Sequence, residues 1–142
     1  MTKILILSDS HSKTIDFNFS DFDYVIHAGD THEDLEGRCI YVKGNCDYNG
    51  PNEVRVNLFG KKFFITHGHL YGVKNGYDRI TYKGFEEEAS FVIFGHTHIP
   101  YFSKERNTIF INPGAYVDGY YRILYDDCIE YYEYSKKKIV RF

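Results

Sequence analysis

The stretch Lys3–His11 reads Lys-Ile-Leu-Ile-Leu-Ser-Asp-Ser-His, so four consecutive aliphatic residues run directly into a polar tail. A continuous aliphatic run of this kind is typical of a β-strand that is buried on both faces, as in a parallel sheet. Side chains that follow such a strand lie at the carboxyl edge of the sheet, where α/β proteins place their functional sites. The stretch therefore predicts a buried strand that delivers Asp9 and His11 to a site.

The same pattern, an apolar run followed by a polar loop, recurs along the chain. These loops are Gly29-Asp30 after Asp23–Ala28, Gly44-Asn45-Cys46-Asp47 after Arg38–Val42, His67-Gly68-His69 after Lys62–Thr66, and Gly95-His96-Thr97-His98 after Phe91–Phe94. Carboxylate, carboxamide and imidazole groups together are ligands that divalent metals favour. A carboxylate has two oxygens, so Asp30 is the candidate bridge between two cations about 3.5–4 Å apart. The order and spacing predict a two-metal hydrolase site.

The remaining segments predict a mainly β structure. Glu53–Phe59 and Lys62–Thr66 form a hairpin, the region Leu70–Ala89 contains a helix, and the chain after Phe94 alternates short strands and turns as in an antiparallel meander. Only His32–Gly37 connect two strands, which is too short for a helical crossover. We therefore expect a reduced helix after Asp30, and a sheet face that a partner subunit covers in a homo-oligomer.

Composition narrows the class of protein. A chain of 142 residues fits one domain, 1–142, and its net charge of −3 argues against a protein that binds nucleic-acid backbones. No apolar run approaches the length that a membrane span needs. Cys39, Cys46 and Cys128 are scattered and no secretory leader precedes them, which favours a reducing, cytoplasmic setting.

The ordered set Asp-x-His, Gly-Asp, Gly-Asn-x-Asp, His-Gly-His and Gly-His-x-His resembles the calcineurin-like metallophosphoesterase family over nearly the whole chain, from Ile4 to about Gly114. Cys46 and the turn Asn112-Pro113-Gly114 are similar to the small YfcE-like phosphodiesterases of bacteria and archaea. The resemblance implies an α/β fold, namely a two-sheet β-sandwich flanked by helices in four αββα layers, here with the reduced helix after Asp30.

The resemblance also implies a ligand set. One metal takes Asp9, His11, Asp30 and His98, and the second takes Asp30, Asn45, His67 and His96. We expect manganese, while iron, nickel and zinc also suit these ligands. A water or hydroxide that bridges the two metals would be the nucleophile for hydrolysis of a phosphoester bond.

Departures from the family pattern indicate the substrate class. Phosphatases of this superfamily commonly carry a proton-donating histidine where this chain has Cys46, and no arginine stands beside any motif. Both points favour a small phosphodiester over a monoester, because a neutral thiol is a poor acid and a monoester dianion profits from a guanidinium. His69 is the candidate proton donor in place of Cys46, and it otherwise lies outside the ligand set, as His32 does.

Further roles are predicted for residues beside the ligands. Asp47 would orient its loop or a ligand histidine, and Cys46, Tyr71 and Lys74 would contact substrate. Two alternatives remain open: a phosphomonoesterase of the same fold, and a non-catalytic scaffold that resembles the retromer subunit of this fold. Every one of the seven ligand positions is filled here, which counts against the scaffold.

Overall fold

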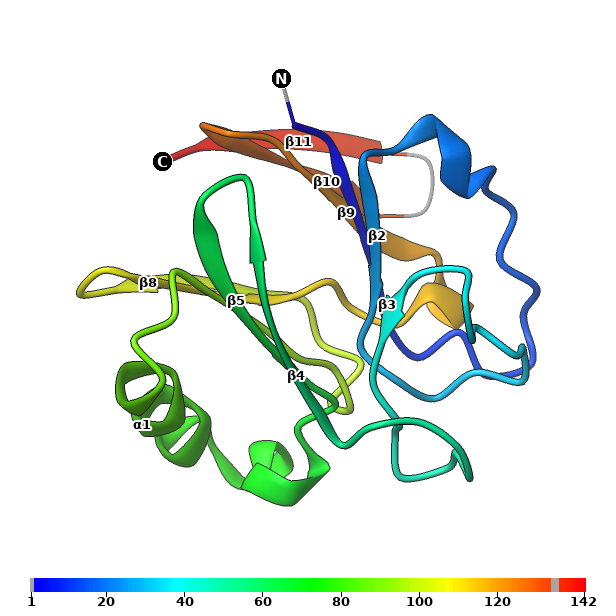
Figure 1. Ribbon diagram of the computed structural model, residues 1–142, viewed down its shortest axis with the longest axis horizontal. Helices are drawn as coiled ribbons and strands as arrows, with labels where there is room; N and C mark the ends of the chain where they lie inside the picture. Colours follow the sequence, from blue (N-terminus) through cyan, green and yellow to red (C-terminus); the bar gives the residue numbers. More distant parts are fainter. Residues whose placement is uncertain (1, 134–135) are drawn as a thin grey trace.

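The computed structural model describes residues 2–133 and 136–142, and it contains two mixed sheets packed face to face (Figure 1). The first sheet has the strand order β11-β10-β9-β1-β2-β3. Its strands are β1 (Ile4–Leu7), β2 (Tyr24–His27), β3 (Ile40–Tyr41), β9 (Tyr120–Leu124), β10 (Cys128–Glu133) and β11 (Lys136–Arg141). β1, β2 and β3 are parallel, whereas β9 pairs antiparallel with β1.

The second sheet has the order β4-β5-β6-β8-β7. Its strands are β4 (Glu53–Leu58), β5 (Lys61–Thr66), β6 (Phe91–Ile93), β7 (Tyr101–Glu105) and β8 (Thr108–Asn112). β5, β6 and β8 are parallel, and β4 and β7 close the two edges as antiparallel strands. The second sheet therefore has a parallel centre, whereas in the first sheet the parallel strands β1, β2 and β3 form one half, next to the antiparallel strands β9, β10 and β11. The continuous apolar runs of β1, β2, β5 and β6 predict these parallel parts.

The main core lies between the two sheets. Successive side chains of a strand point to opposite faces, so Ile4 and Ile6 of β1 enter this core while Leu5 and Leu7 face outward. On the second sheet, Phe63 and Ile65 point inward and Phe64 points outward. Both faces of the central strands are buried, which explains why their sequences show no polar alternation.

The outer layer of the second sheet is helical. The helix α1 (Asp78–Glu86) packs through Ile80 and Gly84 on the cluster that contains Phe64 and Phe110. At Gly84 a Cβ atom would come within 2.8 Å of the Phe110 ring, so the glycine allows the helix to approach closely. The short 3₁₀ turns η2 (His69–Tyr71) and η3 (Val73–Asn75) precede this helix.

The outer face of the first sheet is covered by irregular chain. The segment 15–22, which includes the 3₁₀ turn η1 (Phe19–Asp21), packs Ile15 and three phenylalanines on Leu5 and Leu7. In Figure 1 this segment and α1 lie on opposite outer sides of the sandwich. The predicted two-sheet sandwich is confirmed, and no helix lies in the described segment between Asp30 and β3. The four αββα layers are only partly formed, because among the described residues α1 is the only α-helix and the outer layer of the first sheet is irregular. The reduction also extends to the connection after β1.

The predicted single meander after Phe94 is wrong at one point. The chain leaves the second sheet at the end of β8, passes the 3₁₀ turn η4 (Tyr116–Asp118), and enters the first sheet as β9. Gly114, with φ of 80°, lies in this crossing, and any side chain there would collide with Tyr120. Of the described strands after Phe94, only β9, β10 and β11 form an antiparallel meander. Within residues 2–133 and 136–142, no helix has the length and apolar character required to cross a membrane.

Candidate metal centre

The loops that follow the parallel strands of both sheets meet at one edge of the sandwich. The Asp9 N–H donates to the Gly29 carbonyl at 2.9 Å, which continues the β1–β2 pairing into the loops. The Gly95 N–H donates to the His67 carbonyl at 3.0 Å in the second sheet. Backbone hydrogen bonds therefore hold the predicted ligand loops in register beyond the strands.

Five of the seven predicted ligands have left-handed backbone geometry. They are Asp9 (φ 52°), His11 (φ 48°), Asp30 (φ 65°), His96 (φ 70°) and His98 (φ 64°). Residues other than glycine rarely adopt positive φ, and such strain gathers at functional sites, where the surrounding structure enforces it. Here the strain turns the side chains that follow each strand toward a common point.

One group of side chains surrounds a buried oxygen of Asp9. Its Oδ2 accepts hydrogen bonds from the Ser8 hydroxyl at 2.6 Å and from the backbone N–H of His96 at 3.0 Å. Its Oδ1 has no hydrogen-bond partner among the described residues, although it lies 3.3 Å from His98 Nε2 and 3.7 Å from His11 Nε2. The two imidazole nitrogens are 3.2 Å apart. His11 and His98 are partly exposed, so this group is open to a ligand from solvent.

A second group surrounds the imidazole of His67, which is fully buried. The Nδ1–H donates to the Ala28 carbonyl at 2.7 Å, so Nε2 is the ring nitrogen that would bind a metal after losing its proton. This Nε2 lies 3.2 Å from Asp30 Oδ2 and 3.0 Å from Asn45 Oδ1. His96 completes the group, because its ring nitrogen lies within 4.8 Å of the ligand atoms of Asp30 and His67.

The protonation of these groups suits metal binding. Burial, followed by the nearby His67 and Lys74, lowers the pKa of His96 to about 4, so its ring is neutral at pH 7. Burial opposes charge on both His67 and Asp30, but their mutual contact outweighs it. The contact between the two side chains raises the pKa of His67 and holds the pKa of Asp30 below its usual range. The opposed shifts identify a buried acid–base pair whose proton a metal would replace.

The residues fit a pair of divalent cations. A buried carboxylate oxygen without a hydrogen-bond donor, which faces imidazole nitrogens, requires a positive partner. The groups Asp9–His11–His98 and Asp30–His67–His96 each place their ligand atoms within 4.8 Å of one another, and a third group joins His11, Asp30 and Cys46. Because Asp30 and His11 each occur in two groups, the two candidate positions are adjacent.

Asp47 ties two ligand loops together. Its Oδ2 accepts from the N–H groups of Asp30 and Gly44, both at 2.8 Å, and its Oδ1 accepts from the Thr31 N–H at 3.1 Å. It thus contacts loop backbone rather than a ligand histidine. The Cys46 N–H donates to Asp30 Oδ1 at 2.9 Å, which orients the carboxylate that would bridge the metals.

The remaining predicted residues differ in their relation to the centre. The His69 ring lies 5.4 Å from that of His67, and burial first of all lowers its pKa, so it is neutral at pH 7 and a weak proton donor. Lys74 acts on the pKa of His96. The Tyr71 ring packs against Phe64, and its hydroxyl donates a hydrogen bond to Glu53. Tyr71 therefore packs in the outer layer that contains α1. The substrate contacts of Lys74 and Tyr71 remain predictions.

The sequence reasoning missed His27, which is fully buried at the end of β2. Its Nδ1 accepts from the Gly29 N–H at 3.0 Å, so Nε2 carries the proton and donates to the Ser10 hydroxyl at 2.9 Å. The ring therefore links the loops that carry Asp9 and Asp30. A histidine inside an apolar run was the available signal, since a buried imidazole needs partners. Lys43 was also missed, and its charge acts on the pKa of His69.

Metal-free protein is expected to lose stability in acid because of His27. Burial lowers the pKa of this residue from 6.5 to about 4. The unfolded chain takes up a proton near pH 6.5 and the folded chain does not. The contribution of neutral His27 to the free energy of unfolding is therefore complete above pH 6.5, and it falls by about 3 kcal/mol as the pH drops to about 4. We expect the free energy of unfolding in urea to differ less between about pH 7 and pH 4 in His27→Gln than in the wild-type protein. An equal difference in both proteins would contradict this account.

Comparison with known proteins agrees with this geometry. Residues 2–120 match the model of the calcineurin-like phosphoesterase superfamily domain. The probable metallophosphoesterase YsnB of Bacillus subtilis is 34% identical over 125 residues, which cover 79% of this chain and 73% of YsnB. The phosphodiesterase MJ0936 of Methanocaldococcus jannaschii is 32% identical, with coverage of 79% and 82%.

A solved structure from Streptococcus pneumoniae TIGR4, described as a predicted phosphoesterase, superposes with a TM-score of 0.83. It is 24% identical, and the superposition covers 99% of this chain and 98% of that one, which shows a shared fold. The family match covers most of the chain, and the two relatives exceed 30% identity over more than two thirds of it. The chain therefore belongs to the calcineurin-like phosphoesterase superfamily, among its small YfcE- and YsnB-like members.

Proposed function

We propose that the protein is a phosphodiesterase that depends on two divalent metal ions. The observation that carries this proposal is the buried Asp9 Oδ1, which finds no hydrogen-bond partner in the part of the chain that the structure describes. It faces the imidazoles of His11 and His98 beside the Asp30–His67 group. Such an oxygen is stable only with a cation beside it. The relatives are named for phosphoester hydrolysis, which supports the same chemistry here.

When bound, two divalent cations supply a water of lowered pKa and neutralise charge on the phosphoryl oxygens. The chain fixes the geometry for this chemistry. Asp9 and Asp30 hold defined orientations because each accepts backbone or hydroxyl hydrogen bonds. The ammonium groups of Lys43 and Lys74, which act on the pKa values of His69 and His96, favour approach of an anionic phosphoester. A protein nucleophile is not required.

Cys46 supports the choice of diester over monoester. Burial, and then the charge of Asp30, raise the pKa of its thiol, so the thiol is neutral at pH 7 and a weak acid. A monoester with an alkoxide leaving group needs protonation more than a diester with a good leaving group does. With His69 neutral as well, the site lacks a ready proton donor, and we infer a preference for diesters with stable leaving groups.

Replacing Cys46 by histidine is expected to raise kcat for a phosphomonoester by at least about 10-fold, because an imidazolium can protonate the leaving group. The side chain is exposed, so a larger ring can be accommodated. Activity on a bis-aryl diester should change much less. Cys46→Ser is the matched control, since serine adds no acid. Equal gains from histidine and serine would exclude proton donation as the cause.

The proposed function is tested with protein stripped of metal and then loaded with manganese. We expect hydrolysis of bis(4-nitrophenyl) phosphate and much slower hydrolysis of 4-nitrophenyl phosphate. The reverse preference would indicate the phosphomonoesterase. Absence of both activities at full metal occupancy would favour the scaffold. Reconstitution with iron, nickel and zinc, together with elemental analysis of the purified protein, identifies the metal, for which we propose manganese.

We also propose a cytoplasmic location and a homo-oligomer. The three cysteines are free, which suits a reducing compartment. Irregular chain rather than a helix covers the outer face of the first sheet, where Tyr121 and Tyr132 stack with ring centroids 4.5 Å apart. Light scattering at several concentrations tests the assembly, and a monomer throughout would end that proposal.

A further inference from the structure

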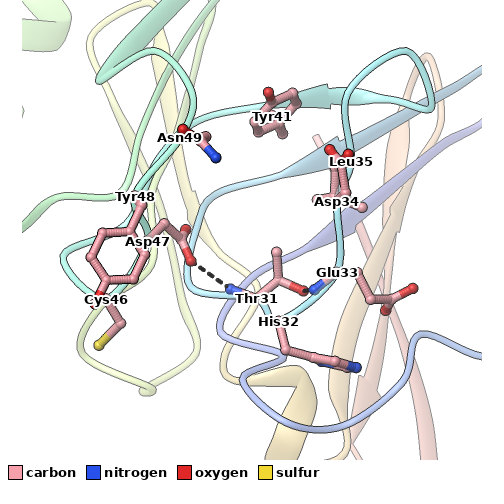
Figure 2. Close-up of a pocket in the computed structure, with 10 residues that line it drawn as sticks. All are labelled: Thr31, His32, Glu33, Asp34, Leu35, Tyr41, Cys46, Asp47, Tyr48 and Asn49. Carbon is pink, nitrogen blue, oxygen red and sulfur yellow. Dashed lines mark hydrogen bonds between the residues drawn. The ribbon is translucent and has the colours of Figure 1, made fainter.

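A cavity of about 440 Å³ lies beside the metal centre. It is lined by the segments Thr31–Leu35 and Cys46–Asn49 together with Tyr41. Figure 2 shows two walls, the loop that follows Asp30 and the loop that follows Asn45, with Tyr41 between them. This volume lies within the range of small-molecule sites.

The cavity is continuous with the centre through Cys46. The side chain of this residue lines the cavity, and its sulfur lies within 4.8 Å of the ligand atoms of His11 and Asp30. His32, also in the lining, donates from Nδ1 to the His11 carbonyl at 2.7 Å, because that oxygen can only accept. A group in the cavity would therefore lie directly beside a phosphoryl group held at the metals.

The two walls are held in a defined arrangement. Asp47 on one wall accepts the Thr31 N–H of the other at 3.1 Å, which is the bond drawn between the walls in Figure 2. On the second wall the Thr31 hydroxyl accepts the Glu33 N–H at 3.1 Å. The cavity is thus built from hydrogen-bonded loops, and a ligand would not have to order it first.

The charges of the cavity exclude one kind of ligand. Its lining contains three carboxylates, of Glu33, Asp34 and Asp47, and no lysine or arginine. Glu36 adds a fourth, since it accepts the hydroxyl hydrogen bond of Tyr41 at 2.6 Å. Arg38 compensates only Glu33, at 3.3 Å. The field is negative, so an anionic group would be repelled here, even though the metals attract a phosphoryl group nearby.

The apolar part of the lining suits a ring. Leu35 is buried, Tyr41 is half-buried, and Tyr48 is 95% exposed. Aromatic side chains beside carboxylates favour a flat neutral group or a cation. Resting on the proposed function, we propose that this cavity holds one alcohol arm of the phosphodiester, and that this arm is an uncharged or cationic group of up to nucleoside size that bears no phosphate.

The test compares two diesters that differ only in the arm, thymidine 5′-(4-nitrophenyl phosphate) and the same compound with a 3′-phosphate. We expect kcat/KM to be about 5- to 10-fold higher for the uncharged arm at low ionic strength. The double variant Asp34→Asn/Glu36→Gln keeps the acceptors for the Glu36 N–H and the Tyr41 hydroxyl. It should raise kcat/KM mainly for the phosphorylated compound.

The matched control is Glu105→Gln/Asp127→Asn, which removes the same charge from exposed positions outside the cavity lining. It should leave the ratio of the two kcat/KM values unchanged. Equal rates for both substrates, or a ratio that Asp34→Asn/Glu36→Gln does not alter, would overturn the inference while the phosphodiesterase stands. Hydrolysis of neither compound would instead reject the proposed function.

A second measurement does not depend on turnover. Thymidine alone, at millimolar concentration, should shift backbone amide NMR signals of the Thr31–Leu35 and Cys46–Asn49 loops in protein loaded with diamagnetic Zn²⁺, because Mn²⁺ would broaden signals this close to the metals. Tyr48→Ala should reduce these shifts, because its exposed ring would be removed from the binding surface. Shifts confined to other regions, or none at either loop, would show that the cavity does not take this group.

Discussion

Asp30→Asn is expected to lower kcat for a phosphodiester by about 10²- to 10³-fold and to reduce the metal content from two ions per chain to at most one. Asparagine has nearly the same shape but only one oxygen, so it cannot bridge two cations. In the wild-type structure Asp30 presents Oδ1 to the Cys46 N–H and Oδ2 to His67 Nε2, so protein contacts position both oxygens.

The measurement combines elemental analysis with steady-state kinetics under saturating manganese. The fold should survive, because the asparagine oxygen can still accept from the Cys46 N–H, and circular dichroism checks this. Asp21→Asn, at an exposed position of η1, is the matched control and should keep both metals and the full rate. A variant at position 30 with two bound metals and wild-type kcat would remove the bridging carboxylate from the mechanism.

The central strands and the residues that follow them are predictable because local sequence determines both. Ile4–Leu7 is uniformly aliphatic, so it can only be stable where both faces are covered. A polar residue directly after such a run therefore lies at the edge of the sheet. That argument alone places Asp9, Asp30 and His67 at one rim, and the structure brings all three together.

The parts that were not predicted depend on contacts between distant residues. β8 and β9 are both short strands that contain apolar residues, and the sequence between them does not indicate that β9 will enter the sheet of β1 rather than that of β8. The role of His27 depends likewise on Ser10, 17 residues earlier. The cover of the first sheet is irregular because Phe17 and Phe19 contact it without a helical repeat.

Close backbone packing is the other property that residue types alone do not reveal, and Gly44 shows its consequence. A Cβ atom at this position would lie 2.0 Å from Asp30 Oδ1 and 2.6 Å from the Asp30 nitrogen. Such distances are far below van der Waals contact, so the Asp30 carboxylate or the loop must move. The glycine in Gly-Asn-x-Asp is therefore required for the observed position of the Asp30 carboxylate and not only for a turn.

Gly44→Ala is accordingly expected to weaken metal binding by about 10- to 100-fold and to reduce kcat/KM at limiting metal by a similar factor. Unfolding in urea should show a loss of about 1–3 kcal/mol from overpacking. Gly60→Ala is the control that distinguishes steric crowding by the added methyl group from backbone strain at positive φ. Gly60 has φ of 79°, but a methyl group added there would have no atom within 4 Å, so this variant should cost about 1–2 kcal/mol and leave metal affinity intact. If both alanine variants bound metal equally well, the approach of Gly44 to Asp30 would have no part in building the site. If only Gly44→Ala lost metal, the loop backbone would be as much a determinant of the centre as its ligands.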